Sequence, residues 1–167
     1  MAANNNDLTE VYRAYQELLT SQQSLTLATI NQDGTPLVSY APFIVTEEKQ
    51  FYIFISQLAG HTANLQRGGQ LSLMLIEDET AVTQIFARRR LIFQSSVESV
   101  PRDSPEGSQA LDQYQARFGN MVKMLRSLPD FQLFKLSPSS GRLILGFGQA
   151  YDVGGPHFET LTHRRSG

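Results

Sequence analysis

The stretch SLTLATINQDGTPLVSYAPFIV, residues 24–45, carries the clearest structural signal in the chain. Two runs rich in apolar and β-branched residues, 24–30 and 36–45, flank the polar segment from Asn31 to Gly34. Gly34 can adopt the left-handed backbone conformation that a short hairpin loop needs. The stretch therefore predicts two antiparallel strands joined by a tight turn.

Further strand patterns follow this hairpin. The segment QFYIFIS, residues 50–56, is apolar at consecutive positions, which predicts a strand buried on both faces. The segment 85–100 is long for one strand, so we expect it to bend or to cross the sheet. The remaining predicted strands are 70–77, 130–136 and 142–151, with a turn over residues 137–141.

Helices are predicted at residues 1–22, at 61–68 and from Ser104 to about Leu125, where apolar residues recur at helical spacing. Ser104 and Pro105 are expected to be the N-cap and the first helical residue of the last of these. Asp7 and Glu10 have the spacing of a capping box, so the first helix is expected to begin at Asp7.

The order of these elements predicts one mainly β domain over residues 1–167, because strands outnumber helices and no βαβ alternation appears. An antiparallel barrel, closed or nearly closed, with an N-terminal helix and a late helix, is the expected architecture. Residues 154–167 follow the last predicted strand, and we expect them to form a flexible C-terminal tail.

The composition of the chain excludes several classes of function. The formal net charge of −2 disfavours nucleic acid as a partner, and the absence of cysteine excludes thiolate metal sites and cysteine nucleophiles. No apolar run approaches the ~20 residues that span a bilayer, and residues 1–10 lack a signal-peptide pattern. We therefore expect a cytoplasmic protein with no membrane partner.

The run Arg88-Arg89-Arg90 lies inside a predicted strand, where alternation would place Arg88 and Arg90 on one face. These arginines could line a solvated face, or they could clamp a carboxylate or a phosphate, which guanidinium groups bind in bidentate fashion. His61 opens the predicted helix 61–68 and could contact an anion or simply be half-buried. His157, His163, Arg164 and Arg165 lie on the predicted tail.

Several segments together resemble the haem-utilisation, haem-degrading proteins of the split β-barrel superfamily, which is also the superfamily of pyridoxamine 5'-phosphate oxidase. The resemblance runs from about Leu25 to Val153. The segments MLIEDET (74–80) and GFGQAY (146–151) are similar to the haem-type branch, whereas ATINQDGTP (28–36) is shared by the whole superfamily.

The resemblance implies a homodimer with two cofactor sites at the subunit interface, holding haem and its iron in one branch and FMN in the other. Flavin members carry an arginine and a lysine for the phosphate after the first hairpin. Residues 38–43, VSYAPF, contain no basic residue here, which favours haem.

In the haem branch, the resemblance implies that Arg90 contacts a haem propionate. It also implies that Asp130 supports the axial histidine of the neighbouring subunit. An imidazole that ligates iron needs a hydrogen bond on its other nitrogen, which explains a carboxylate in that role. Asp130 could also be an ordinary turn residue.

The axial histidine of the family lies in a Gly-His-Arg segment on the C-terminal tail. With a shorter tail here, THRR (162–165) places His163 and Arg164 in that role, and His163 becomes the iron ligand. In a gapless register, that segment would begin at Gly167. The ligand is then missing, or His157 or His163 reaches the iron from a new direction.

The expected function is therefore that of a haem-binding and haem-degrading, oxygenase-type enzyme, which needs an electron donor that the sequence does not identify. The alternatives are an FMN-binding oxidoreductase, with Arg88, Arg90 and His61 near the phosphate, and a non-catalytic haem-binding module.

Overall fold

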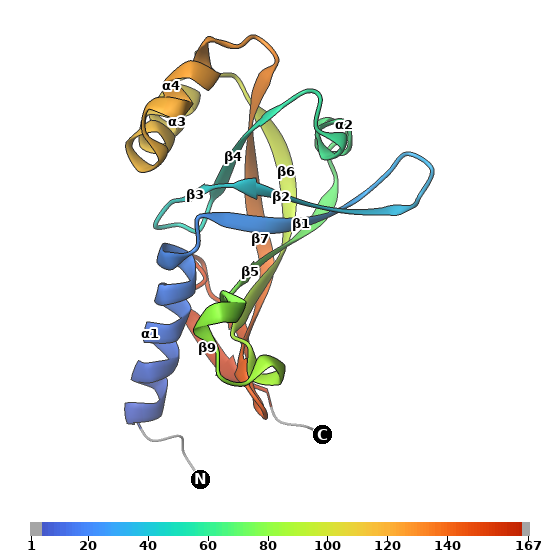
Figure 1. The fold of residues 1–167 in the computed structure, drawn as a ribbon. Coiled ribbons are helices and arrows are strands. Elements are labelled where there is room, and N and C mark those ends of the chain that lie inside the picture. The colour runs from blue at the N-terminus through green and yellow to red at the C-terminus, as the bar shows by residue number, and fades with distance from the viewer. Residues whose placement is uncertain (1–4, 165–167) are drawn as a thin grey trace.

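A computed structural model describes residues 5–164, with side chains from Leu8 onward. Within this range the chain forms one antiparallel sheet of nine strands, flanked by helices and curved around a central core (Figure 1). The split β-barrel with flanking helices is therefore confirmed. The helices are α1 (Asn5–Ser21), α2 (Gly60–Gln66), α3 (Pro105–Phe118) and α4 (Asn120–Ser127), with short 3-10 turns η1 (Glu79–Ala81) and η2 (Ile85–Ala87).

The strand order is β2-β1-β5-β6-β7-β4-β3, and β8 and β9 extend the sheet from β7. All of the strand pairs are antiparallel. The strands are β1 (Ser24–Ile30), β2 (Pro36–Pro42), β3 (Ile44–Val45), β4 (Phe51–Ser56), β5 (Gln70–Ile76), β6 (Arg90–Val100), β7 (Phe131–Gly146), β8 (Gln149–Gly154) and β9 (Thr160–His163).

The predicted hairpin is confirmed. Strands β1 and β2 pair in register from Ser24 opposite Pro42 to Ile30 opposite Pro36, and Gly34 in the turn has φ 84°. The second strand is shorter than the expected 36–45, because β2 ends at Pro42 and β3 pairs with β4 instead. Proline has no backbone N–H to donate to a ladder, which explains the break at this point.

Strand β7 corrects the expected turn over residues 137–141. The strand continues through this segment and pairs with β6 from Leu133 to Ile144, with a shift in register at Ser139. A methyl group added at Gly141 would lie 2.5 Å from the Phe93 ring. This glycine therefore permits a close approach between strands, and the actual turn lies at Phe147 and Gly148, between β7 and β8.

The late helix is also divided. The Ser104 side chain accepts a hydrogen bond from the Gly107 N–H at 3.0 Å, so the predicted cap is confirmed. Gly119, with φ 74°, then separates α3 from α4. The first helix includes Asp7 inside it rather than at its start, because α1 begins at Asn5.

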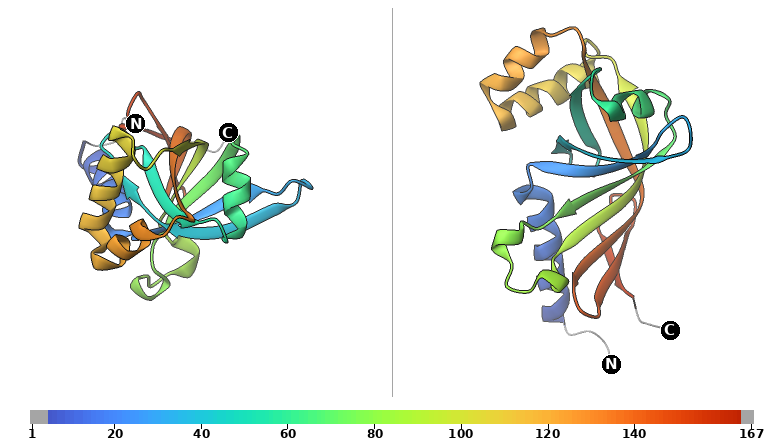
Figure 2. Two further views of the ribbon diagram at one scale, coloured as in Figure 1. Left: turned by 90° about the horizontal axis from the view of Figure 1, so that it is seen from above. Right: turned by 45° about the vertical axis from the view of Figure 1, so that its right-hand side comes forward.

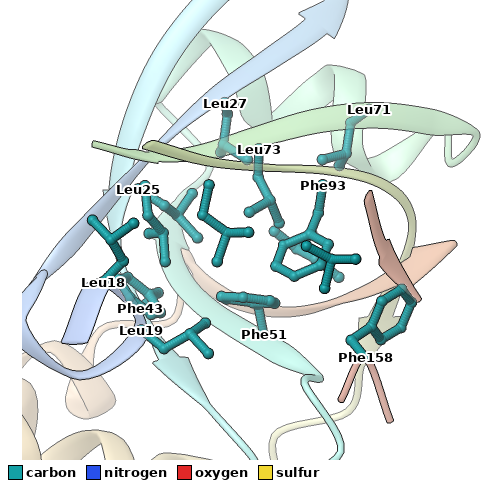
Figure 3. Packing of buried hydrophobic residues seen from close by; sticks show 14 of the residues in the cluster. Leu18, Leu19, Leu25, Leu27, Phe43, Phe51, Leu71, Leu73, Phe93 and Phe158 are labelled. Carbon is teal, nitrogen blue, oxygen red and sulfur yellow. The ribbon is translucent and has the colours of Figure 1, made fainter. Parts of the chain in front are cut away.

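Two hydrophobic clusters lie on opposite faces of β4. Phe51 and Ile53 point into the barrel with α1 (Figure 3), and Tyr52 and Phe54 pack under α3 and α4. Strand β4 is therefore buried on both faces, as predicted.

The segment expected to be a tail forms β9, which pairs with β8 and ends at His163. Phe158, in the loop between β8 and β9, stacks edge-on against Phe93 in the barrel, with ring centroids 5.4 Å apart. The Tyr15 hydroxyl donates to the Phe158 carbonyl at 2.9 Å and ties this loop to α1. The expectation of a flexible segment after residue 153 therefore does not hold for residues 154–163, because these contacts anchor the chain.

Candidate functional site

The three consecutive arginines have three different environments. Arg88 and Arg89 precede β6, so the predicted placement of Arg88 and Arg90 on one strand face is wrong. Arg88 pairs with Glu79 at 3.2 Å and donates to the Glu77 carbonyl at 2.6 Å. Unlike Arg90, Arg88 therefore has a carboxylate counter-ion, which makes it the less suitable arginine for an anionic ligand.

Arg89 is a structural residue. Its guanidinium pairs with Glu77 at 2.6 Å and with Glu17 of α1 at 2.9 Å. Partial burial alone would raise the pKa of Glu77, but the hydrogen bonds from Arg89 outweigh it and lower that pKa. This network fastens α1 to the ends of β5 and β6.

Arg90 remains the available arginine of the three. Its Nη1 donates to the Arg88 carbonyl at 3.0 Å, and no carboxylate within residues 8–164 pairs with it. A positively charged group that is oriented by one bond and lacks a counter-ion suits an anionic ligand.

His163 lies on the same end of the sheet as Arg90. Arg90 lies opposite Ile144 and Ile144 opposite Ala150, whose carbonyl accepts the backbone N–H of Arg164 at 2.8 Å. Three strand spacings, about 14 Å, therefore separate the backbones of Arg90 and Arg164. His163 lies opposite Tyr151 in the row that contains Leu91, so its side chain projects from the sheet face opposite to that of Arg90.

The imidazole of His163 is exposed and oriented. Its Nε2 lies 3.0 Å from the Gly148 carbonyl, and its ring meets Tyr151 edge-on at 5.1 Å. A carbonyl only accepts, so Nε2 carries the proton in this hydrogen bond. In the neutral ring, Nδ1 then keeps the lone pair that a metal needs.

Exposed aromatic side chains lie at this end of the sheet. Phe86 is 78% exposed and Phe147 is 73% exposed. They adjoin Ala87 and Gly146, which approach so closely that a methyl group added at Gly146 would lie 3.9 Å from Ala87 Cβ. Sequence reasoning missed these two phenylalanines, because nothing in the local pattern distinguishes an exposed aromatic residue from a buried one.

Asp130 and His61 lie at the other end of the molecule. Asp130 Oδ2 accepts a hydrogen bond from the Ser56 hydroxyl at 2.6 Å, and Thr62 Oγ1 donates to the Ser56 carbonyl at 2.7 Å. The end of β4 therefore holds Asp130, and α2 is bonded to the same residue of β4. Sequence reasoning missed Ser56, since its partner is 74 residues away.

His61 is buried in α2, and burial lowers the pKa of its imidazole. Its Nε2 has no hydrogen-bond partner among the described residues. A neutral ring inside the protein does not supply the charge that a phosphate needs.

One copy of the chain does not bring Asp130 and His163 together. Asp130 immediately precedes β7, whereas His163 lies level with Leu143, near the far end of that strand. The 14 residues from Asp130 to Ile144 correspond to about 45 Å of extended chain. Figure 2 shows α3 and α4 at one end of the molecule and the C-terminal hairpin at the other.

The other candidate residues of the predicted tail that the structure describes, His157 and Arg164, are exposed. The His157 backbone N–H donates to the Glu159 carboxylate at 2.8 Å, and Arg164 Nε lies 3.6 Å from Asp152 Oδ2. Arg165 lies outside the described residues. In the part of the chain that the structure describes, no group of three or more His, Cys, Asp or Glu could hold a metal ion. No helix among these residues is long and apolar enough to span a bilayer.

Comparison with known proteins agrees with the fold and with the family that the sequence segments resemble. Residues 12–145 match the family model described as pyridoxamine 5'-phosphate oxidase. The chain belongs to this family, and within it to the haem-utilisation branch of split-barrel proteins.

One of the relatives is named for haem. The chain is 41% identical over 152 residues to the protein named heme oxygenase HutZ of Vibrio cholerae, covering 91% of this chain and 86% of that one. The crystal structure of HutZ, described there as a heme storage protein, has 40% identity and a TM-score of 0.74 over 80% of this chain and 93% of that chain. ChuZ of Campylobacter jejuni has 31% identity and a TM-score of 0.80 over 93% of this chain, which spans only 63% of ChuZ.

Proposed function

We propose that two copies of this chain bind haem between them and open its porphyrin ring by oxidation, releasing iron and a biliverdin-type product. The observation that carries the proposal is that Arg90 and His163 lie at one end of the sheet and Asp130 at the other. A site that uses all three residues needs two copies. The names of the relatives, heme oxygenase and heme storage protein, support the ligand.

Two residues at the first end would hold haem. The unpaired guanidinium of Arg90 suits a propionate carboxylate, and the exposed imidazole of His163 suits the iron. Phe86 and Phe147 supply apolar surface for the ring edge. Arg88 is not assigned here, because Glu79 and the Glu77 carbonyl already bind it.

Asp130 of the second copy would accept a hydrogen bond from the imidazole of His163. The His163 N–H needs an acceptor, which the Gly148 carbonyl provides within one copy. A carboxylate in place of the carbonyl would raise the basicity of the imidazole and hold the ring in one orientation. The Ser56 hydroxyl holds one oxygen of Asp130 and leaves the other available. The bound haem supplies the redox chemistry with dioxygen and external electrons.

The outer face of the sheet supports a dimer. One row of outward side chains crosses six strands in register: Tyr40, Thr26, Met74, Ile92, Arg142 and Asp152. Tyr40 and its strand neighbour Val38 are 69% and 70% exposed. Large exposed apolar patches mark protein interfaces. A two-fold axis across this face would bring the Asp130 end of one copy near the His163 end of the other.

An absorbance titration with hemin tests the proposal. We expect a saturable Soret shift near one hemin per subunit in the wild type, and none in His163→Ala. The matched control is His157→Ala, because His157 is also exposed and makes no ring contact that the structure describes. A Soret shift in His163→Ala equal to that of the wild type would remove His163 from the site.

Ascorbate and oxygen then separate enzyme from storage protein. Loss of the Soret band under these conditions supports ring opening. A stable band would instead favour a non-catalytic haem-binding protein, a reading that the description of HutZ as a heme storage protein also supports.

FMN is the second candidate ligand, because the matching family is described as pyridoxamine 5'-phosphate oxidase and its flavin members bind FMN. Against it, residues 38–43 hold no cation and His61 is buried and neutral. A parallel titration with FMN decides: tight FMN binding without a hemin response would reverse the assignment.

A further inference from the structure

A cleft of about 480 Å³ lies between the β1–β2 turn, the C-terminal end of α2 and the start of β5. Its volume falls in the range of about 300–1,000 Å³ that is usual for small-molecule sites. None of the four residues Arg90, His163, Asp130 and His61 lines it, so it is separate from the haem site proposed above.

The cleft has a rigid polar wall built on Asn64. This side chain is only 7% exposed and uses both of its polar atoms. Its Nδ2 donates to Thr29 Oγ1 at 3.0 Å and to Asn31 Oδ1 at 2.9 Å, and its Oδ1 accepts from Arg67 Nη2 at 2.9 Å. A buried amide with all partners in place fixes the groups around it.

Arg67 is held in position but not neutralised. Its Nη2 also donates to the Ile30 carbonyl at 2.6 Å, which binds the guanidinium to the end of β1. Among residues 8–164, no carboxylate pairs with Arg67, and its Nε and Nη1 have no partner. A pre-oriented guanidinium with free N–H groups binds an oxyanion without a large ordering cost.

The other lining residues suit an uncharged body attached to that anion. Because Leu65 and Leu71 are buried, the accessible apolar surface of the lining comes from Ile30, which is 54% exposed. Gln32 and Gln70 are the exposed amides of the lining. We propose that this cleft binds a small organic anion, which has a flat apolar body and one carboxylate or phosphate that Arg67 holds. The proposal does not depend on haem.

The test is a ¹H–¹⁵N NMR titration of the full chain with phenyl phosphate, benzoate, inorganic phosphate and benzyl alcohol. We expect phenyl phosphate or benzoate to shift the amide signals of Gly68, Gly69 and Gln32 saturably. Benzyl alcohol lacks the anion and inorganic phosphate lacks the apolar body, so each should bind at least about tenfold more weakly. The stronger of phenyl phosphate and benzoate identifies the preferred anion.

Two variants assign the binding to Arg67. Arg67→Gln should weaken binding about tenfold or more, because it removes a charge-assisted hydrogen bond. Arg67→Lys keeps the charge but not the fork, and an intermediate loss is expected. The control Arg13→Gln removes an exposed arginine of α1 and should bind as the wild type does.

Three results would overturn the inference: no saturable shift in the cleft, equal binding of benzyl alcohol, or unchanged affinity in both Arg67 variants. Since these outcomes are independent of the hemin titration, failure here leaves the proposed function standing, and the reverse also holds.

Discussion

The separation of Asp130 from His163 leads to a prediction about mixed dimers. If each haem site takes His163 from one copy and Asp130 from the other, two differently damaged chains can complement each other. A dimer of one His163→Ala chain and one Asp130→Asn chain keeps one intact site, formed by the unaltered residue of each chain. Its second site carries both substitutions.

The magnitude follows from the geometry and from counting sites. About 45 Å of strand separates the two residues within a chain, so no site can form from one copy alone. Mixed dimers that are purified through two different affinity tags should show roughly half of the wild-type rate, because one of their two sites works. Unsorted random mixtures should show roughly one quarter, because half of the dimers are mixed.

The assay is the rate of Soret loss under ascorbate and oxygen. The matched control pairs a chain that carries both substitutions with a wild-type chain, a dimer in which each site contains one altered residue. We expect this control to be as inactive as the single-variant homodimers. The opposite pattern, an active control and an inactive complementing dimer, would refute the shared site and place both residues in one copy.

Two further predictions concern stability. Gly141→Ala forces a methyl group against Phe93 and should lower the free energy of unfolding in urea by about 1–3 kcal/mol. The control Gly154→Ala, with no described atom within 4 Å of the new methyl, should change that free energy by less than about 0.5 kcal/mol. Equal effects of the two substitutions would contradict the packing argument. Hydrogen bonds from Arg89 hold the pKa of Glu77 below its value of 4.5 in the unfolded chain, so Glu77 stabilises the fold above that pH, and this contribution disappears as the pH falls through the folded pKa. Glu77→Gln should therefore lose less stability than the wild type between about pH 6 and pH 3, and parallel curves would exclude the ion pair as the cause.

Local sequence patterns were sufficient wherever one segment carries its own signal. The hairpin around Gly34 needs only a turn residue and two alternating runs, and the cap at Ser104 needs only its own helix. Strand β4 was predicted as buried on both faces because its apolar residues are consecutive. These features depend on neighbours in the chain, whose chemistry is visible in the sequence.

The predictions were wrong where a segment distant in the sequence determines the environment of a residue. Gly141 looks like a turn residue, but the Phe93 ring on the neighbouring strand explains it. The arginines look alike in sequence, yet Glu17 and Glu77 bind Arg89, whereas no carboxylate among residues 8–164 pairs with Arg90.

The sequence by itself determined the strand-rich class, the family and the candidate residues, because residue type and short-range periodicity are local properties. Only the tertiary structure decided that His163 lies on a strand, at the same end of the sheet as Arg90 and far from Asp130. Sheet pairing between segments many residues apart sets these positions, and no local pattern encodes which strands become neighbours.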